Sequence, residues 1–433
     1  MSRVAVCGMG YVGCVTAACL CRDGHQVIGV DIDERKVASL ASGMAPVSEP
    51  GLDDLLQQVT GEGLLTATTN LEEAVANTDI ALIAVGTPSA IDGSIDTHAV
   101  ERVIASIGQA LAENGREYTI VLRSTLLPGV LEETLRPILE QALGGPLGDR
   151  VRLCNNPEFL RETTAIQDYD SPPFVVIGAE EEWQADAVLE LYSRIDAPRV
   201  VTDTRTAALV KYTCNAYHAA KVAFANEIGT LARALGANGQ EVMQIACLDT
   251  QLNVSPAYLR PGFAFGGSCL PKDVRALTRF SQREAVASPL LSSLLPSNEA
   301  HLLRGAQAVE QSGHRKIGLV GLSFKANTDD LRESPLVKIA EHLHGRGYDL
   351  RIYDPGVQVS RLLGSNRTYV EQHLPHFAEL MVDTPEQLCE HSELVVLGTN
   401  VANGFDWSAH SNGDVLDLRR DLVVATGEAA PVP

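Results

Sequence analysis

The chain has 433 residues, enough for two or three domains of ordinary size. Apolar residues make up 45% and charged residues 21% of the chain, which excludes a disordered, collagen-like or coiled-coil protein. With 34 basic and 55 acidic residues the net charge is −21, which argues against a broad nucleic-acid-binding surface. An anionic ligand of so acidic a protein needs a local cluster of positive groups.

The nine cysteines are odd in number, form no CxxC pair and lack the spacing of metal ligands. A chain of this size needs no disulfide bonds, so we expect free thiols, no bound metal and a cytoplasmic location. No uncharged apolar run approaches the ~18 residues of a membrane-spanning helix, and three glycines interrupt the apolar N-terminus. We therefore expect neither a membrane partner nor a signal peptide.

The first 130 residues alternate short apolar runs with segments of helical length. Strands are predicted at residues 4–7, 27–30, 80–85 and 119–122, and a helix at residues 11–22. Strands that are apolar along nearly their whole length are typical of a parallel sheet with helices on both faces. The pattern predicts an α/β fold with a doubly wound, Rossmann-like sheet.

A similar order of strands returns later in the chain. Predicted strands at 316–320, 349–353 and 393–397 are followed by Gly321, Asp354 and a Gly-Thr pair, which resemble the residues that follow the earlier strands. This predicts a second α/β unit about 310 residues after the first. Chance similarity between buried strands is the alternative.

The stretch between these two units favours a helix. It has no proline between Pro198 and Pro256, and residues 209–235 are rich in helix-forming types. We predict one long helix, or two nearly continuous ones, that joins the units and brings the carboxyl edges of both sheets to one cleft. The predicted domain boundaries are 1–202, 203–300 and 301–433, with the central helical region in the second of these ranges.

Residues 8–13 read GMGYVG, a GxGxxG sequence between a predicted strand and a predicted helix. Its glycines permit a tight turn, a close approach of the backbone to a pyrophosphate and close packing of the helix, whose N-terminus attracts phosphate. Asp31 follows the next strand, where a carboxylate binds a ribose 2′-hydroxyl and repels a 2′-phosphate. The pattern predicts NAD over NADP, although Arg35 and Lys36 weaken the preference. A glycine-rich turn without a cofactor is the alternative.

Residues 260–273, RPGFAFGGSCLPKD, are the most unusual stretch. Two glycines before Cys269 let the backbone approach a ligand, and the ammonium of Lys272 nearby favours a nucleophilic thiolate. A thiol beside an NAD site can trap an aldehyde as a thiohemiacetal, whose oxidation gives a thioester that water hydrolyses. A buried and inert cysteine is the alternative.

Two further groups of polar residues have open interpretations. Lys211, Asn215, His218 and Asn226 fall on one stripe of the predicted long helix, which faces either solvent or a ligand cleft. The segment 155–162, NNPEFLRE, brings two carboxylates either to a site or to a surface turn.

The second unit lacks a full glycine fingerprint, so a second dinucleotide is not expected. The lysine that follows its turn, Lys325, either is solvated or meets a nucleotide diphosphate.

The chain resembles the nucleotide-sugar 6-dehydrogenases, the family of UDP-glucose and GDP-mannose dehydrogenases, over nearly its whole length. The motifs that occur in the family's order are GMGYVG, VGTP, STLLPG, NPEFLRE, KYTCNAYHA, GGSCLPKD and FKANTDDLRESP. GGSCLPKD after KYTCN is very specific, and KYTCNAYHAAKVAFANEIG and RPGFAFGGSC resemble the GDP-mannose branch more than the UDP-glucose branch. The segment 399–404 departs from the family pattern, which leaves base recognition in the second unit open.

The resemblance implies a four-electron oxidation of a CH2OH group at C6 to a carboxylate, with two NAD used in turn and no release of aldehyde. The catalytic residues that it implies are Cys269, Lys211, Asn215, Asp273, Glu158 and Thr125. Cys269 would be the covalent nucleophile, and Lys211 would hold the oxyanion together with Asn215. Either Asp273 or Glu158 would handle the proton of the attacking water, and the residues do not rank the two.

The resemblance implies that Thr125 helps to position the attacking water. It also implies that residues 1–202 bind NAD and that residues 301–433 bind the sugar nucleotide. The cofactor-binding residues are Gly8, Gly10, Tyr11, Val12, Gly13, Asp31, Lys36, Thr87, Thr125, Lys272 and Arg332. The substrate-binding residues are Glu162, Lys211, Asn215, His218, Asn226, Ala257, Tyr258, Arg260, Phe263 and Lys325. The expected assembly is a homodimer or a higher homo-oligomer, in which the Arg260 loop serves the partner's site, and the family association suggests alginate-type polysaccharide supply.

The leading hypothesis is therefore oxidation of GDP-mannose to GDP-mannuronate. A dehydrogenase for UDP-glucose or another UDP-hexose is the alternative within the same class. A two-electron hydroxyacid dehydrogenase would explain the fold but leave Cys269 without a role. An NAD-binding sensor or scaffold that has lost turnover is the alternative from a different class.

Overall fold

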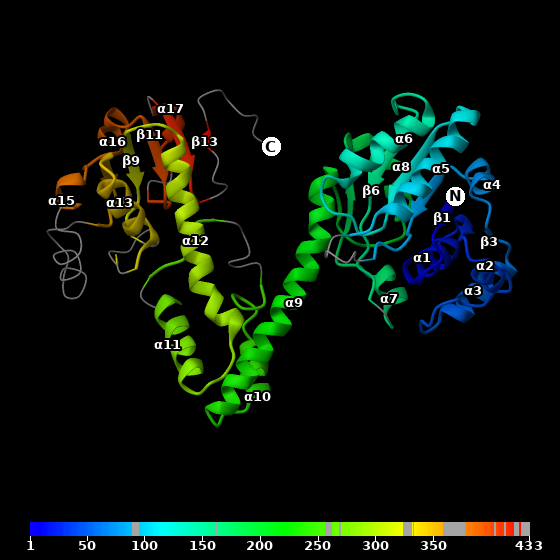
Figure 1. The fold of residues 1–433 in the computed structure, drawn as a ribbon, viewed down its shortest axis with the longest axis horizontal. Coiled ribbons are helices and arrows are strands. Elements are labelled where there is room, and N and C mark those ends of the chain that lie inside the picture. The colour runs from blue at the N-terminus through cyan, green and yellow to red at the C-terminus, as the bar shows by residue number, and fades with distance from the viewer. Residues whose placement is uncertain are drawn as a thin grey trace. The chain divides into compact units, whose positions relative to one another are not determined.

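The structure is a computed structural model of the chain (Figure 1). The residues that it describes are 1–88, 95–161, 163–255, 262–267, 270–323, 331, 333–357, 377–401, 404–410, 413–419 and 424–425. The chain divides into two compact units, Met1–Ala219 and Ala220–Pro433. In the part of the chain that is described, no helix has both the length and the apolar composition that crossing a membrane requires.

The first unit contains an eight-stranded sheet in the order β3-β2-β1-β4-β5-β6-β7-β8. Its strands are β1 (Arg3–Cys7), β2 (Gln26–Val30), β3 (Leu65–Thr68), β4 (Ile80–Ile83), β5 (Tyr118–Leu122), β6 (Val151–Asn155), β7 (Val175–Gly178) and β8 (Arg199–Thr202). Neighbours are parallel except β6 and β7. From β1 the chain continues to β2 and β3 on one side of the sheet and then crosses to β4 on the other side. The strand order therefore reverses between β1 and β4, and parallel sheets of this kind bind ligands at such a reversal.

Helices cover both faces of this sheet. They are α1 (Tyr11–Arg22), α2 (Glu34–Ala41), α3 (Leu52–Gly61), α4 (Leu71–Asn77), α5 (His98–Asn114), α6 (Arg136–Leu143), α7 (Ala165–Asp170) and α8 (Asp186–Leu191), with a π-helical turn at Leu131–Leu135 and a 3₁₀ turn at Glu182–Ala185. The cluster beside α1, α2, α3, α7 and α8 includes Val4 and Val6, and the cluster beside α4, α5 and α6 includes Ala5 and Cys7. Alternate residues of β1 thus enter opposite layers, which explains why this strand is apolar throughout.

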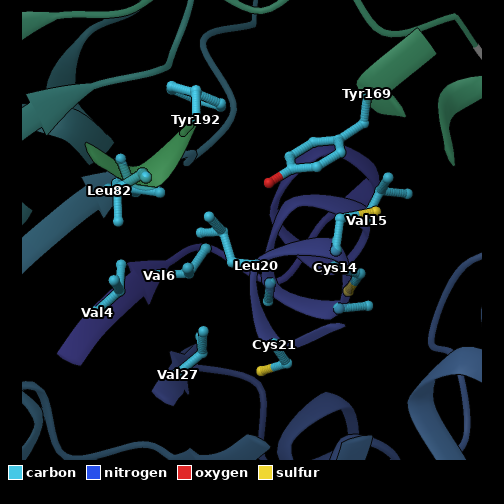
Figure 2. Packing of buried hydrophobic residues seen from close by; sticks show 14 of the residues in the cluster. Val4, Val6, Cys14, Val15, Leu20, Cys21, Val27, Leu82, Tyr169 and Tyr192 are labelled. Atoms are coloured by element: carbon cyan, nitrogen blue, oxygen red, sulfur yellow. The ribbon is translucent and has the colours of Figure 1, made fainter. Parts of the chain in front are cut away.

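The layer around α1 also holds several cysteines (Figure 2). Cys14 and Cys21 lie on α1 among Val6, Leu20 and Val27, and all of them are almost completely buried. Burial raises the pKa of the Cys14 thiol and of the Cys21 thiol to about 12. These thiols are therefore protonated at neutral pH and act as small apolar side chains.

The second unit contains a five-stranded sheet in the order β10-β9-β11-β12-β13, parallel except for its last pair. The strands are β9 (Lys316–Val320), β10 (Asp349–Tyr353), β11 (Leu394–Leu397), β12 (Asp414–Asp417) and β13 (Val424–Ala425). The helices are α10 (Gly239–Ala246), α11 (Leu270–Arg283), α12 (Pro289–Gln311), α13 (Pro335–Gly345), α15 (Phe377–Leu380), α16 (Pro385–His391) and α17 (Trp407–His410). Residues of α12 and α13 pack on one face, and residues of α16 and α17 on the other.

The two sheets share the geometry of their first turn. Asp31 accepts a hydrogen bond from the Met9 N–H at 2.8 Å, and Asp354 accepts one from the Leu322 N–H at 2.8 Å. The turn in the second unit contains Gly321 with a φ of 91°, a value that glycine adopts without strain. The predicted repeat of strand endings is thus present in three dimensions.

A single helix, α9 (Thr204–Ala234), runs through the division between the units. It has 31 residues and includes most of the stretch for which a long helix was predicted. The predicted fold class, two Rossmann-like parallel-sheet domains with a long connecting helix, is confirmed. The division into regions 1–202, 203–300 and 301–433 stays a prediction.

Candidate active site

The turn between β1 and α1 has the geometry of a dinucleotide-binding loop. Gly8 has a φ of 95°, and a Cβ at this position would lie 2.8 Å from the backbone nitrogen of Val85. A Cβ at Gly13 would lie 1.9 Å from the carbonyl oxygen of Gly8, so helix and strand pack this closely only with glycine there. At Gly10, by contrast, no atom of the described residues lies within 4 Å of the position that a Cβ would take, which leaves the backbone open to a ligand.

The start of α1 is available to an anion. Its N-cap residue is Gly10, and no side chain of the described residues caps the helix, whose first residues are Tyr11 and Val12. The first N–H groups of a helix carry partial positive charge and bind phosphate oxygens. The loop therefore fits the pyrophosphate of a dinucleotide.

Asp31 lies beside this loop and is 9% exposed. One carboxylate oxygen accepts from Met9 N and from Lys36 Nζ, at 2.8 and 3.1 Å, and the other accepts from Asp33 N at 2.9 Å. A cavity of about 280 Å³ opens here, with Gly8 and Asp31 among its lining residues and mostly apolar side chains around them. Apolar walls with one carboxylate fit the adenosine half of the cofactor, with Asp31 toward the ribose.

Thr87 and Thr125 come together at the carboxyl edge of the same sheet. The Thr87 hydroxyl donates to the carbonyl oxygen of Thr125 at 3.0 Å. Ser124 anchors the neighbouring backbone, because its hydroxyl donates to the carbonyl of Val85 at 2.6 Å. The ends of β4 and β5 are thereby tied to each other next to the glycine loop.

A larger cavity, of about 490 Å³, lies in the first unit between the segment after β6 and the first half of α9. We call it the sugar cavity, after the substrate that the family resemblance implies. Lys211, Asn215 and His218 all line it, because residues 4 and 7 positions apart fall on one face of a helix. The polar stripe on the long helix therefore faces a cavity, at least as far as His218.

An ion pair lies at the edge of the sugar cavity. Lys211 Nζ lies 2.9 Å from Glu158 Oε1, and the side chains are 11% and 12% exposed. The other oxygen of Glu158 accepts from the Leu160 N–H at 2.7 Å, and the ammonium lies 5.4 Å from the centre of the Phe159 ring. The ammonium is thus fixed by a carboxylate and an aromatic face, as a group that stabilises a developing negative charge must be.

The structure adds a residue that the sequence analysis missed. Arg123 also lines the sugar cavity and is 6% exposed. It donates to Asn156 Oδ1 at 2.8 Å and to the Tyr192 hydroxyl at 2.9 Å, and no carboxylate among the described residues forms an ion pair with it. Burial raises the pKa of Tyr192, which therefore stays a neutral hydrogen-bonding partner. The only hint in the sequence was an arginine directly after an apolar strand.

The remaining predicted site residues fall into two groups. Asn226, Phe263 and Asp273 belong to the second unit, where Asn226 and Asp273 are exposed and Phe263 lies with its ring centre 6.3 Å from that of His301. The predicted residues that lie outside the described residues are Cys269, Glu162, Ala257, Tyr258, Arg260, Lys325 and Arg332, together with the side chain of Lys272. Of the predicted catalytic and substrate-binding residues that the structure describes, the sugar cavity brings together Lys211, Asn215 and His218, and Lys211 in turn pairs with Glu158.

Comparison with known proteins identifies the family. Three domains of the UDP-glucose/GDP-mannose dehydrogenase family match the chain: the NAD binding domain at residues 2–196, the central domain at 205–300 and the UDP binding domain at 318–419. The chain belongs to this family. It is thus an NAD-dependent nucleotide-sugar dehydrogenase, as predicted.

Individual relatives agree with this assignment. The chain is 48% identical to the GDP-mannose 6-dehydrogenase of Pseudomonas putida, over 92% of this chain and 90% of that protein. It is 34% identical to a UDP-glucose 6-dehydrogenase of Haloferax volcanii, over 82% of this chain and 83% of that one. Among solved structures, a ternary complex of GDP-mannose dehydrogenase from Pseudomonas aeruginosa matches with a TM-score of 0.93 and 45% identity, over 96% of both chains.

Proposed function

We propose that this family member oxidises C6 of GDP-mannose to the carboxylate of GDP-mannuronate and reduces two NAD for each sugar. The observation that carries the choice of sugar nucleotide is the similarity to the GDP-mannose 6-dehydrogenases of Pseudomonas, 47–48% identity over 92% of the chain. Two UDP-glucose 6-dehydrogenases that also match, from Haloferax volcanii and Bacillus subtilis, are 34% and 33% identical. The α9 sequence KYTCNAYHAAKVAFANEIG, which resembles the GDP-mannose branch of the family, supports the same choice.

The geometry of the sugar cavity supports the first oxidation. When bound, NAD supplies the acceptor for the hydride that leaves C6 in each two-electron step. The C6 hydroxyl must lose its proton as the hydride leaves, and the fixed ammonium of Lys211 stabilises the oxyanion that develops. Asn215, one helical turn further along α9, adds a hydrogen bond to the same oxygen.

The second oxidation is assigned to Cys269, on the basis of its motif. Its thiolate adds to the C6 aldehyde and forms a thiohemiacetal, and loss of a second hydride converts this adduct into a thioester. Water then attacks the thioester carbonyl, the C–S bond breaks and the carboxylate leaves. Glu158 takes the proton of the attacking water in our proposal, because it contacts Lys211, while Asp273 remains the alternative base.

Product stoichiometry is the decisive test of this function. Purified protein is incubated with limiting GDP-mannose and excess NAD, and NADH is counted by absorbance while the sugar nucleotide is identified by mass spectrometry. Two NADH and one GDP-mannuronate per GDP-mannose are expected. One NADH per sugar, or activity in a substrate panel on UDP-glucose alone, would contradict the proposal. Binding of NAD and sugar nucleotide without any NADH would point to a sensor.

The proposal includes a homodimer or a higher homo-oligomer in the cytoplasm. Apolar side chains are exposed on the second half of α9 and on and after α10: Phe224 is 40%, Leu235 56%, Ile245 60% and Leu248 78% exposed. An exposed apolar surface of this kind favours association with another chain, and a second copy supplies a matching surface. Light scattering after size-exclusion chromatography should give a mass of at least two chains.

A further inference from the structure

Glu49 is a buried carboxylate that lines neither cavity and takes no part in the chemistry above. It is 7% exposed. Its Oε1 accepts from the Ala165 N–H at 2.8 Å, and its Oε2 accepts from the Thr163 N–H at 2.8 Å and contacts the Tyr11 hydroxyl. Three donors from two distant parts of the chain therefore converge on one buried charge, an arrangement in which each hydrogen bond is strong.

The first of these parts contains a residue with a strained backbone, Thr163. Thr163 has a φ of 73°, a left-handed conformation that is strained for a β-branched residue and persists only where surrounding contacts hold it. Arg161, which precedes it by two positions, lines the sugar cavity together with Asp168, and its side chain pairs with Asp168 at 2.6 Å. In sequence, the predicted substrate-binding residue Glu162 stands between Arg161 and Thr163.

The second part is the start of the cofactor-binding helix. Tyr11 is the first residue of α1 and comes directly after Gly10 of the dinucleotide loop. Its hydroxyl lies 3.3 Å from the Arg161 carbonyl oxygen and 3.0 Å from the Thr163 nitrogen, in addition to its contact with Glu49. Tyr11 therefore touches Thr163 at the same place as Glu49 does.

We propose that Glu49 is a positioning residue that couples the two binding sites of the first unit. By holding Thr163 in its left-handed conformation against Tyr11, it orders the wall of the sugar cavity and the dinucleotide loop together. The proposal rests on the function proposed above. The simpler role, a cap on α7, accounts for the bond from Ala165 but for neither the strain at Thr163 nor the contact with Tyr11.

The test uses full-length variants and the nucleotide sugar that the wild type oxidises in the substrate panel. Glu49→Gln keeps the size of the side chain but removes its charge and one acceptor. We expect KM for NAD and KM for the sugar nucleotide each to rise about tenfold or more, with kcat within about threefold of the wild type. Thr163→Gly in the Glu49→Gln background should bring both KM values back to within about threefold, because glycine adopts this φ without help.

Two further variants separate positioning from stability. Glu393→Gln is the control for the loss of a carboxylate that accepts two backbone hydrogen bonds, here from Arg315 and Lys316 at an exposed position of the second unit, and it should leave both KM values unchanged. Tyr11→Phe keeps both backbone bonds to Glu49 and gives a folded test even where Glu49→Gln does not fold. It should raise KM for the sugar nucleotide as well as KM for NAD.

The opposite results would overturn the coupling. One such result is that folded Glu49→Gln has the KM values of the wild type. Another is that Tyr11→Phe raises KM for NAD alone, and a third is that Thr163→Gly does not restore the KM values of Glu49→Gln. A wild type that oxidises only UDP-glucose would refute the proposed substrate and leave the coupling to be judged on UDP-glucose. Failure of the coupling and failure of the proposed function are thus distinguishable.

Discussion

Lys211 and Glu158 form an ion pair that joins α9 to the segment after β6, with the nitrogen and oxygen 2.9 Å apart. Both side chains are about nine-tenths buried, so each charge depends on the other for compensation. Removing one partner from such a pair leaves an unpaired buried charge and costs about 3–5 kcal/mol, whereas replacing both is far less costly. This asymmetry separates the role of the pair in folding from its proposed role in catalysis.

The first prediction follows from this pair. Lys211→Met and Glu158→Gln should each lower the free energy of unfolding, and the double variant should recover most of the loss. Activity should not recover, because the oxyanion has lost its cation, and kcat should fall about 100-fold or more in every variant without Lys211. Urea unfolding and steady-state kinetics measure the two effects. A double variant with normal kcat would remove Lys211 from the mechanism.

The second prediction concerns the choice between NAD and NADP. Asp31→Asn keeps an acceptor for the Met9 N–H but removes the negative charge that we propose for contact with the ribose. We expect kcat/KM for NAD to fall about tenfold or more and the ratio of NAD to NADP activity to fall with it. Asp354→Asn is the control, since Asp354 has the same turn geometry in the second unit, and it should leave this ratio unchanged.

The third prediction tests the covalent step. Cys269→Ala should abolish formation of the acid while NAD still binds to the glycine loop with wild-type affinity. Mass spectrometry of the sugar nucleotide and a fluorescence titration with NADH provide the two measurements. Cys247→Ala is the control, because Cys247 is an exposed cysteine of the second unit. Normal production of the acid by Cys269→Ala would refute the thioester.

The fourth prediction is a dependence of stability on pH. A hydrogen bond from the Arg161 side chain holds the pKa of Asp168 below its ordinary value. A carboxylate with a lowered pKa stabilises the fold above its unfolded-state pKa of about 3.9, and this contribution disappears as the pH falls through the folded-state pKa. Since Arg161 is mostly exposed, we expect Asp168→Asn to lose about 1 kcal/mol near neutral pH.

The measurement for Asp168 compares urea unfolding of the variant and the wild type across pH. The difference between them should be constant from about pH 5 to pH 7 and should shrink below about pH 4, where the wild-type carboxylate takes up its proton. A difference that stays constant at acidic pH would mean that Asp168 stabilises the loop by packing and not by charge.

Local patterns were sufficient for the main architecture. The apolar runs that became β1, β4 and β5 predicted a parallel sheet, because a strand buried on both faces must be apolar on both. The roles of Gly8 and Gly13 in the turn and in close packing could be predicted because they depend on residues near in sequence, while the contact of Asp31 with a ribose stays a prediction. Family motifs then supplied the chemistry.

The fold class, the cofactor and the polar stripe at Lys211 could therefore be predicted from local patterns, because they depend on residues within a few turns or one strand of each other. Which polar side chains are buried, and which groups they contact, depends instead on tertiary packing. Arg123 reaches Tyr192 across 69 positions and Glu49 reaches Thr163 across 114, and no periodicity in a single chain marks such pairs. Their meeting depends on how strands and helices pack, which brings distant residues together after the local elements have formed.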